Sequence, residues 1–333
     1  MSPRPWVPRL LLALAVGCGS PGPPPAELPS RPLRVVLQKF LGFAPLLIAD
    51  KEGYFRAVGL DVEFVSINRT HDALPAMLTG DVDVLAGPAG ASVLSAMARG
   101  QPIRAVADKG YLAADSCASM SIMVPAATAG GSNPGQRIKT LTIGRDAATR
   151  YLAAVALEAN GIMLDSITTV ILPDAVVAEA LRKGTIDAAS AGEPWQSRIK
   201  AQTPGVEWLR FERYLPDHQY SLIFFGRYLL QERPDIGARF LAAYRRGVAR
   251  YNEGKTARNL ALLTEATGED SATLARACWP MMRPDSRINL PSLIRYQAWA
   301  RRQGFLDAEA SPEQIWDSSL VVRSDSILAH GER

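Results

Sequence analysis

Histidine and cysteine are scarce in this sequence, with three residues of each among 333. Metal sites need several such side chains close together, and no cluster here has the spacing of metal ligands. The formal net charge is only +4, and no basic stripe or nucleic-acid motif occurs. After the first residues, no run is long and apolar enough to cross a membrane. We therefore expect no metal, no cofactor and no nucleic-acid partner.

The beginning of the chain has the pattern of an export signal. Arg4 and Arg9 precede an apolar run at 10–17, LLLALAVG, which is far too short to span a bilayer. The run ends at Cys18, and the segment AVGC resembles a bacterial lipobox, in which the cysteine is acylated and becomes the new N-terminus. An ordinary signal peptide cleaved nearby is the alternative, and both interpretations export the protein. We expect residues 1–17 to be a signal peptide and Cys18 to anchor the protein to a bacterial membrane, facing the periplasm or the exterior.

A proline-rich segment follows the predicted anchor. Residues 18–32 contain six prolines and hardly any large apolar side chains, so the segment cannot bury a core. It should run as an extended spacer of about 3 Å per residue. Such a tether suits a folded body that works a short distance from a membrane.

Strands and helices alternate along the remaining 300 or so residues, which are enough for two domains. A first series is predicted with strands at 33–37, 60–65, 82–86 and 103–107, and with helices at 44–51, 71–79 and 89–99. A second series has strands at 119–124, 141–144, 167–172 and 186–190, and helices at 147–160 and 174–183. From residue 234 the chain is predicted to be helical, at 234–253, 256–267, 271–280 and 291–303.

A short pattern, Ala-x-x-x-Gly-x-x-Asp, occurs once in each series. It lies at Ala76–Asp83 and at Ala180–Asp187. In both places a helix ends at a glycine, where a left-handed C-cap is least strained, and a buried strand begins. The pattern therefore favours two internally similar lobes. Because ligands of open α/β sheets bind at the carboxyl ends of the strands, the loops at those ends should line a cleft between the lobes.

Several segments resemble one family of binding proteins. They are APLLIADKEGYFRAVGLDVEF at 44–64, MLTGDVDVLAGPAGA at 77–91, LEANGIMLDSITTVILP at 157–173 and ALRKGTIDAASAGEPW at 180–195. Their order and spacing resemble those of the solute-binding proteins of ABC importers for nitrate, sulfonates and taurine, a superfamily that includes thiamine-pyrimidine uptake proteins. The resemblance covers residues 33–230 well and the C-terminal helices only loosely. It says almost nothing about the ligand.

The resemblance implies an α/β fold of the type II periplasmic-binding-protein kind, with a mostly parallel sheet flanked by helices in each lobe and the ligand cleft between them. We expect lobe 1 to comprise residues 33–115 and 225–333, and lobe 2 to comprise residues 116–224. The chain should cross between the lobes near Ala114–Ala118 and Tyr220–Phe225. Sequence alone leaves open whether Cys117 and Cys278 form a disulfide or stay apart as thiols.

Candidate ligand-binding residues lie in the predicted strand-end loops and at the second crossover. They are Gln38, Phe40, Phe43, Asn68, His71, Gly87, Pro88, Thr149, Arg150, Glu193, Trp195 and Tyr220. Arg150, at a predicted helix start, and Arg69 favour an anionic group. Glu193 favours an amine, and Trp195 a ring or alkyl chain.

Each of these residues also has a structural interpretation. Glu193 can cap the next helix, Trp195 can seal a lobe, and Phe43 can pack in the core. His71 can be a cap or a surface group, and Arg150 a solvated charge.

The residues and the resemblance together predict a monomeric, membrane-anchored receptor. It would deliver a small organic solute, anionic or zwitterionic, to an ABC permease and its ATPase. One alternative is a lipoprotein sensor that binds a ligand but acts on a signalling protein. The other is an enzyme like the fungal thiamine-pyrimidine synthases of the same superfamily. We expect no enzymatic activity, because no catalytic set is assembled in the sequence.

Overall fold

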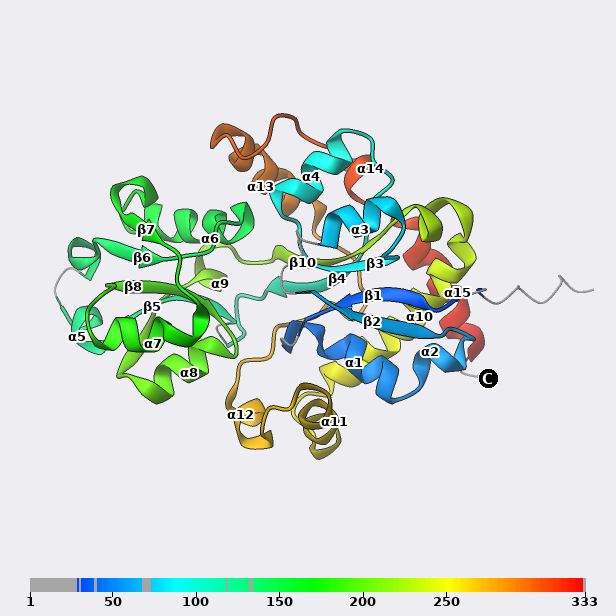
Figure 1. The fold of residues 1–333 in the computed structure, drawn as a ribbon, viewed down its shortest axis with the longest axis horizontal. Helices are drawn as coiled ribbons and strands as arrows, with labels where there is room; N and C mark the ends of the chain where they lie inside the picture. Colours follow the sequence, from blue (N-terminus) through cyan, green and yellow to red (C-terminus); the bar gives the residue numbers. More distant parts are fainter. Residues whose placement is uncertain are drawn as a thin grey trace, which may run out of the picture.

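Two lobes lie side by side in the computed structural model, each built around a five-stranded sheet (Figure 1). The structure describes residues 29, 31–38, 41–67, 73–117, 119–131 and 134–331. The predicted signal peptide and the lipid attachment site at Cys18 lie outside these residues, as does the predicted tether up to residue 28 and at residue 30.

The first lobe contains a mixed sheet of strand order β2-β1-β3-β10-β4. Its strands are β1 (Leu33–Leu37), β2 (Val62–Ser66), β3 (Val84–Pro88), β4 (Arg104–Leu112) and β10 (His218–Phe225). Strand β1 pairs in parallel with β2 and β3, whereas β10 is antiparallel to both β3 and β4. Four strands therefore run in one direction, and β10 is inserted among them in the reverse direction.

The second lobe repeats this arrangement with the order β7-β6-β8-β5-β9. Its strands are β5 (Met120–Pro125), β6 (Thr140–Thr142), β7 (Thr168–Val170), β8 (Ala188–Gly192) and β9 (Gly205–Arg210). Strand β6 is parallel to β7 and β8, and β5 is antiparallel to β8 and β9. The prediction of two similar, mostly parallel sheets is confirmed.

The reversed strand of each sheet is the one that enters from the other lobe. Strand β5 follows the first crossover, which lies between Leu112 and Met120. Strand β10 follows the second crossover, and its pairing with β3 and β4 places residues 218–225 in the sheet of lobe 1. The expected crossover at Tyr220–Phe225 and the expected lobe boundary at 224 are therefore too late in the chain. A strand that arrives from the facing lobe enters at the carboxyl ends of its neighbours, so it must run against them.

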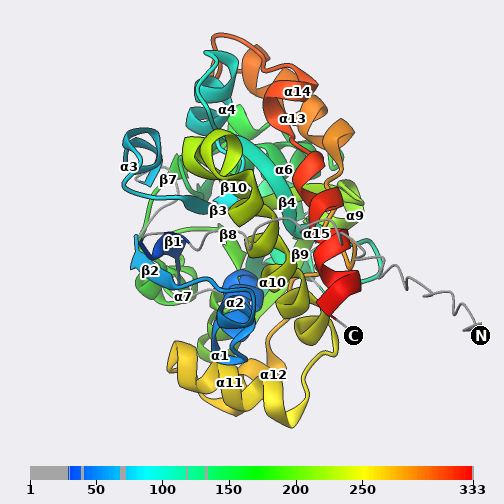
Figure 2. The same ribbon diagram turned by 90° about the vertical axis from the view of Figure 1, so that its right-hand side faces the viewer.

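Helices cover both faces of each sheet, and the helices of the C-terminal part of the chain enlarge lobe 1 (Figures 1 and 2). In lobe 1 they are α1 (Ala44–Lys51), α2 (Tyr54–Ala57), α3 (Leu74–Thr79) and α4 (Ala91–Ala98), with a 3-10 turn at Leu41–Phe43 and a π-helix at Tyr228–Glu232. In lobe 2 they are α5 (Ala126–Ala129), α6 (Ala147–Glu158), α7 (Asp174–Arg182), α8 (Trp195–Gln202) and α9 (Phe211–Tyr214), with 3-10 turns at Pro134–Arg137 and Leu164–Ser166. The C-terminal part adds α10 (Pro234–Asn252), α11 (Ala257–Thr267), α12 (Ser271–Arg276), α13 (Leu290–Arg302), α14 (Pro312–Ile315) and α15 (Ser319–Gly331).

The largest buried cluster continues from one lobe into the other. Alternation along β1 places Val35 in a core shared with α1 and α10, and Val36 in a core shared with α4 and α13. The second of these cores also contains Tyr151 and Leu152 from α6 of lobe 2. The two lobes are therefore joined by apolar packing between α6 and α13 as well as by the two crossovers.

Candidate functional site

A buried lysine lies at the carboxyl end of β4, where the sheet of lobe 1 meets the crossovers. The Lys109 side chain is 3% exposed, and its Nζ donates a hydrogen bond of 3.1 Å to the hydroxyl of Ser221 in β10. The same Nζ lies 3.8 Å from the centre of the Phe43 ring, at the end of the β1–α1 loop. Pro88, at the end of β3, lies directly opposite Ser221 in the sheet register. The β1–α1 loop and the start of β10 thus both contact one ammonium group.

No carboxylate of a described residue forms an ion pair with this ammonium group. The neighbouring Asp108 is also buried, but its carboxylate accepts from Gln219 Nε2 at 2.6 Å and from the backbone N–H groups of Arg283 at 2.8 Å and Gly110 at 3.1 Å. Burial lowers the pKa of Lys109 to about 7, with a smaller opposing effect of Asp108. Burial also raises the pKa of Asp108 to about 6, against the effect of its hydrogen bonds.

Tyr220 and Thr149, which were both expected in lobe 2, lie in different lobes and meet at their junction. Burial raises the pKa of the Tyr220 hydroxyl, the nearby Asp146 carboxylate raises it further, and a hydrogen bond with Thr149 has the opposite effect. Asp146 is the N-cap of α6 and accepts from the Thr149 backbone N–H at 2.8 Å. The residue before Ser221 is therefore in contact with the start of a lobe 2 helix, so β10 begins at the lobe junction.

An aromatic cluster closes one side of this junction. The Tyr151 ring of α6 lies 5.3 Å from the His218 ring, 5.4 Å from Tyr296 and 5.3 Å from Trp299, measured between ring centres.

Arg150, next to Tyr151, is half-buried, and its side chain has no hydrogen-bond or ion-pair partner within the described part of the chain. Its guanidinium group is therefore available to a ligand or to solvent.

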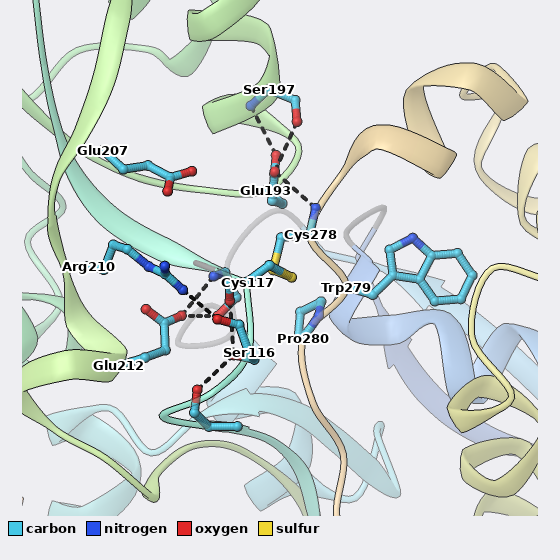
Figure 3. Close-up of a disulfide and its surroundings, with 12 residues drawn as sticks. Ser116, Cys117, Glu193, Ser197, Glu207, Arg210, Glu212, Cys278, Trp279 and Pro280 are labelled. Atoms are coloured by element: carbon cyan, nitrogen blue, oxygen red, sulfur yellow. Dashed lines mark hydrogen bonds between the residues drawn. A yellow bond between two sulfur atoms is a disulfide. The ribbon is translucent and has the colours of Figure 1, made fainter.

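Glu193 lies beside a disulfide between Cys117 and Cys278 (Figure 3). Glu193 accepts from Ser197 N–H at 3.0 Å, from the Ser197 hydroxyl at 2.9 Å and from Cys278 N–H at 3.1 Å. Arg198 lies 4.5 Å from the centre of the Trp195 ring. These contacts match the structural interpretation of Glu193, in which it caps the following helix, and they add a bridge to lobe 1.

A cavity of about 500 Å³ opens next to this disulfide. It is lined by Cys117, Glu193, Ser197, Lys200, Ala201, Glu207, Arg210, Lys255, Arg276, Ala277 and Cys278. Several of its charges have partners: Lys200 pairs with Glu207, Lys255 Nζ donates to the Ala275 carbonyl at 2.7 Å, and Arg210 donates to the Ser116 carbonyl. Of the predicted ligand-binding residues that are described, Glu193 alone lines it.

Three of the remaining predicted residues, Gln38, Gly87 and Pro88, lie at or next to the ends of strands in lobe 1. Gln38 Nε2 donates to the Ile67 carbonyl at 3.2 Å, which ties the end of β1 to the end of β2. Gly87 is buried and Pro88 half-buried at the end of β3. Phe40, Asn68, Arg69 and His71 lie outside the described residues.

Sequence reasoning missed Lys109, Ser221 and Asp108. A signal was present, because two adjacent charged residues, Asp108 and Lys109, directly follow the apolar strand segment at 103–107. Within the described ranges there is no group of three His, Cys, Asp or Glu side chains that could hold a metal ion. Nor does this part of the chain contain a helix with the length and apolar character of a membrane span.

Comparison with solved structures supports the fold. The aliphatic sulphonate-binding protein SsuA of Escherichia coli matches with a TM-score of 0.70 and 17% identity, over 86% of this chain and 92% of that one. The nitrate-binding protein NrtA of Synechocystis matches with a TM-score of 0.70 and 13% identity, over 92% of each chain. The desulfurization enzyme DSZB matches with a TM-score of 0.61 and 14% identity, over 89% of this chain and 99% of that one. At such low identities these matches establish a shared two-lobed fold of the type II periplasmic-binding-protein kind.

Sequence comparison identifies the family. No curated protein sequence matches the chain. A model of the family described as NMT1/THI5 like matches residues 41–253, which include both crossovers, the whole second sheet and the residues around Lys109. Since this match spans more than half of the chain, the protein belongs to the NMT1/THI5-like family.

Proposed function

We propose that this protein is an extracytoplasmic solute receptor that closes its two lobes on a small organic anion or zwitterion and presents it to an ABC permease and its ATPase. The observation that carries the proposal is the convergence of the lobe 1 strand ends with the start of α6 of lobe 2, through Tyr220 and Thr149. A ligand that contacts both sides of this junction stabilises the closed arrangement, which a permease can then recognise.

Two further observations support this function. The structurally similar SsuA and NrtA are described as sulphonate-binding and nitrate-binding proteins. The disulfide between Cys117 and Cys278 suits an oxidising compartment outside the cytoplasm. We also propose that Cys18 carries the lipid anchor and that the proline-rich segment after it is the tether. A sensor that uses the same ligand site but contacts a signalling protein has the same requirements within this chain.

An enzymatic function is the second candidate, because the desulfurization enzyme DSZB shares the fold. Nucleophilic catalysis by a cysteine requires a free thiolate. Both Cys117 and Cys278 are consumed by the disulfide, so neither offers a thiolate nucleophile in this oxidised form. The receptor function therefore fits the described residues better than thiol chemistry does.

A thermal-shift panel tests the proposal on the purified protein. The panel contains taurine and other sulfonates, nitrate, bicarbonate, aromatic carboxylates, and pyrimidines with thiamine fragments. A ligand at a thousandfold its dissociation constant should stabilise the folded state by about 4 kcal/mol, which raises Tm by several degrees. A ligand that is recovered unchanged after incubation supports a receptor, whereas conversion of a hit into a product would support an enzyme.

A further inference from the structure

We infer that Lys109 provides the positive charge against which the ligand's acidic group binds, and that the ligand is an organic molecule with a carboxylate or sulfonate. The inference rests on the proposed receptor function and adds to it a specificity-determining residue and a chemical class. It follows from the surroundings of the Lys109 ammonium group.

Among the described residues, the Lys109 ammonium group has no carboxylate partner, although a buried charge requires one. Lys109 is 3% exposed, and its Nζ contacts one hydroxyl, that of Ser221, and the face of the Phe43 ring. A hydroxyl and an aromatic face replace only part of the lost hydration, because burying a charge without an opposite charge is strongly unfavourable. Met or Leu would fill the same space without this cost, so the lysine is better explained by a charge that arrives with the ligand.

Asp108 does not serve as that opposite charge. Adjacent residues of a strand point to opposite faces of the sheet, and the Asp108 carboxylate is directed to Gln219 and to the segment around Arg283. Both of its oxygens already accept hydrogen bonds, Oδ1 from Gln219 and Gly110 and Oδ2 from Arg283. Asp108 is therefore next to Lys109 in the sequence, but its carboxylate is not paired with the ammonium group.

The position of the ammonium also suits a ligand held between the lobes. A Cβ atom placed on Gly42 would lie 3.4 Å from Lys109 Nζ, so the β1–α1 loop passes directly over the group without a side chain of its own at that point. Ser221 lies near the start of β10, the end at which this strand enters lobe 1 from lobe 2. An acid that binds Lys109 would thus lie at the edge of the sheet from which the chain crosses to the other lobe.

The chemical class follows from these neighbours. A carboxylate or sulfonate can accept from the ammonium and from the Ser221 hydroxyl at once. The Phe43 ring covers one side of the ammonium with an apolar surface. A cationic ligand group would be repelled here, and a neutral one would leave the buried charge uncompensated.

The test compares neutral variants of Lys109 with a matched surface variant by isothermal titration calorimetry. Lys109→Met removes the charge and keeps the length of the side chain, and Lys109→Gln removes the charge but keeps a donor for Ser221. Lys139→Met is the control, because Lys139 is exposed on lobe 2. Each protein is titrated with the strongest acidic ligand of the thermal-shift panel and with its uncharged primary amide. The Tm of each ligand-free variant shows whether it is folded.

We expect both Lys109 variants to bind the acid at least 100-fold more weakly than the unmodified protein. The Lys139 variant should bind it with unchanged affinity, and the difference between acid and amide should shrink in both Lys109 variants. The inference is overturned if the Lys109 variants retain the acid within threefold, or if the best ligand of the unmodified protein carries no acidic group. If the unmodified protein binds no member of the panel, the receptor proposal fails first, and this separates the two failures.

Discussion

At the scale of single residues, burial keeps the imidazole of His218 uncharged between the lobes. The side chain is 3% exposed, and burial, together with the nearby Arg295, lowers its pKa to about 4. An unfolded chain takes up a proton at histidine below about pH 6.5. The unfolded state therefore binds more protons than the folded state between pH 6.5 and about 4.

This difference predicts a pH dependence of stability. Because the unfolded state binds the extra proton, the free energy of unfolding should fall by about 3 kcal/mol through His218 as the pH drops from 6.5 to 4. Asp108, whose pKa is raised to about 6, contributes in the opposite direction over this range. The difference between the unmodified protein and His218→Phe, measured by urea denaturation at several pH values, isolates the histidine. Parallel curves for the two proteins would contradict the prediction.

The candidate site was predictable where position in the fold determines it. Thr149 was expected near a helix start and lies in the first turn of α6, whereas Tyr220 was expected at a crossover and lies in strand β10. Lys109 was not predictable in this way, because a lysine within a strand is usually exposed at an edge. Its burial depends on Phe43 and Ser221, which are distant in sequence. Glu193 was the preferred candidate, but its carboxylate is occupied by Ser197 and Cys278.

At the scale of elements, the repeated pattern has a common physical role. Asp83 accepts from the Arg34 backbone N–H at 2.9 Å, and Asp187 accepts from the Thr140 backbone N–H at 2.8 Å. Each aspartate therefore fastens its own strand, β3 or β8, to the beginning of the neighbouring strand, β1 or β6. In lobe 1, Arg31 adds two hydrogen bonds of 2.8 Å to the same carboxylate. In both lobes, the aspartate of the sequence pattern thus joins two neighbouring parallel strands by a hydrogen bond.

Helix α10 depends on a small residue for its close packing against α1. A Cβ atom on Gly247 would collide with the Pro45 carbonyl oxygen and lie 3.0 Å from the Ala49 side chain. Gly247→Ala should therefore lower the free energy of unfolding by about 1–3 kcal/mol, because the two helices must move apart. Gly130→Ala is the control, since its nearest neighbour would be the Ala126 carbonyl oxygen at 3.6 Å and its φ of −75° suits alanine. Equal stability of the two variants, measured by urea denaturation, would show that α10 tolerates the added methyl group.

Elements with a clear hydrophobic period were predicted to within a few residues, and α10 was expected at 234–253. Strand β9 was missed, and helix α8 was considered only as the helix that Glu193 could cap, without bounds. Helix α8 buries only Gln196 and Ile199, so it has too few apolar positions to show a helical period. Strand β10 was expected as a crossover for another reason: the place where the chain enters the other lobe depends on strand pairing, and local sequence does not contain that information.

At the scale of the whole molecule, two kinds of contact hold the lobes together beside the disulfide. Glu193 of lobe 2 accepts from the Cys278 backbone, and Arg198 of α8 forms an ion pair of 2.5 Å with Glu269, next to α12. Cys117 belongs to the first crossover, and Cys278 follows α12. The disulfide therefore joins the hinge itself to the C-terminal part of lobe 1.

Removal of this disulfide should destabilise the protein substantially. The bond closes a loop with a sequence separation of 161 residues, and the entropy that it removes from the unfolded chain corresponds to about 2–5 kcal/mol. We expect the double variant Cys117→Ser, Cys278→Ser to have a lower Tm than the oxidised protein. Dithiothreitol should lower the Tm of the unmodified protein to a similar value and leave that of the variant unchanged. An unmodified protein insensitive to the reductant, with the bond shown by mass analysis to be broken, would contradict this.

The same bond changes what a protease can release. The whole second sheet, strand β10 and helices α10 to α12 lie between Cys117 and Cys278 in the chain. A single cut anywhere in that stretch yields two polypeptides that stay covalently attached to each other. In an environment that contains proteases, a nicked molecule would therefore keep both lobes on one particle, and the second lobe could leave only after a second cut or after reduction.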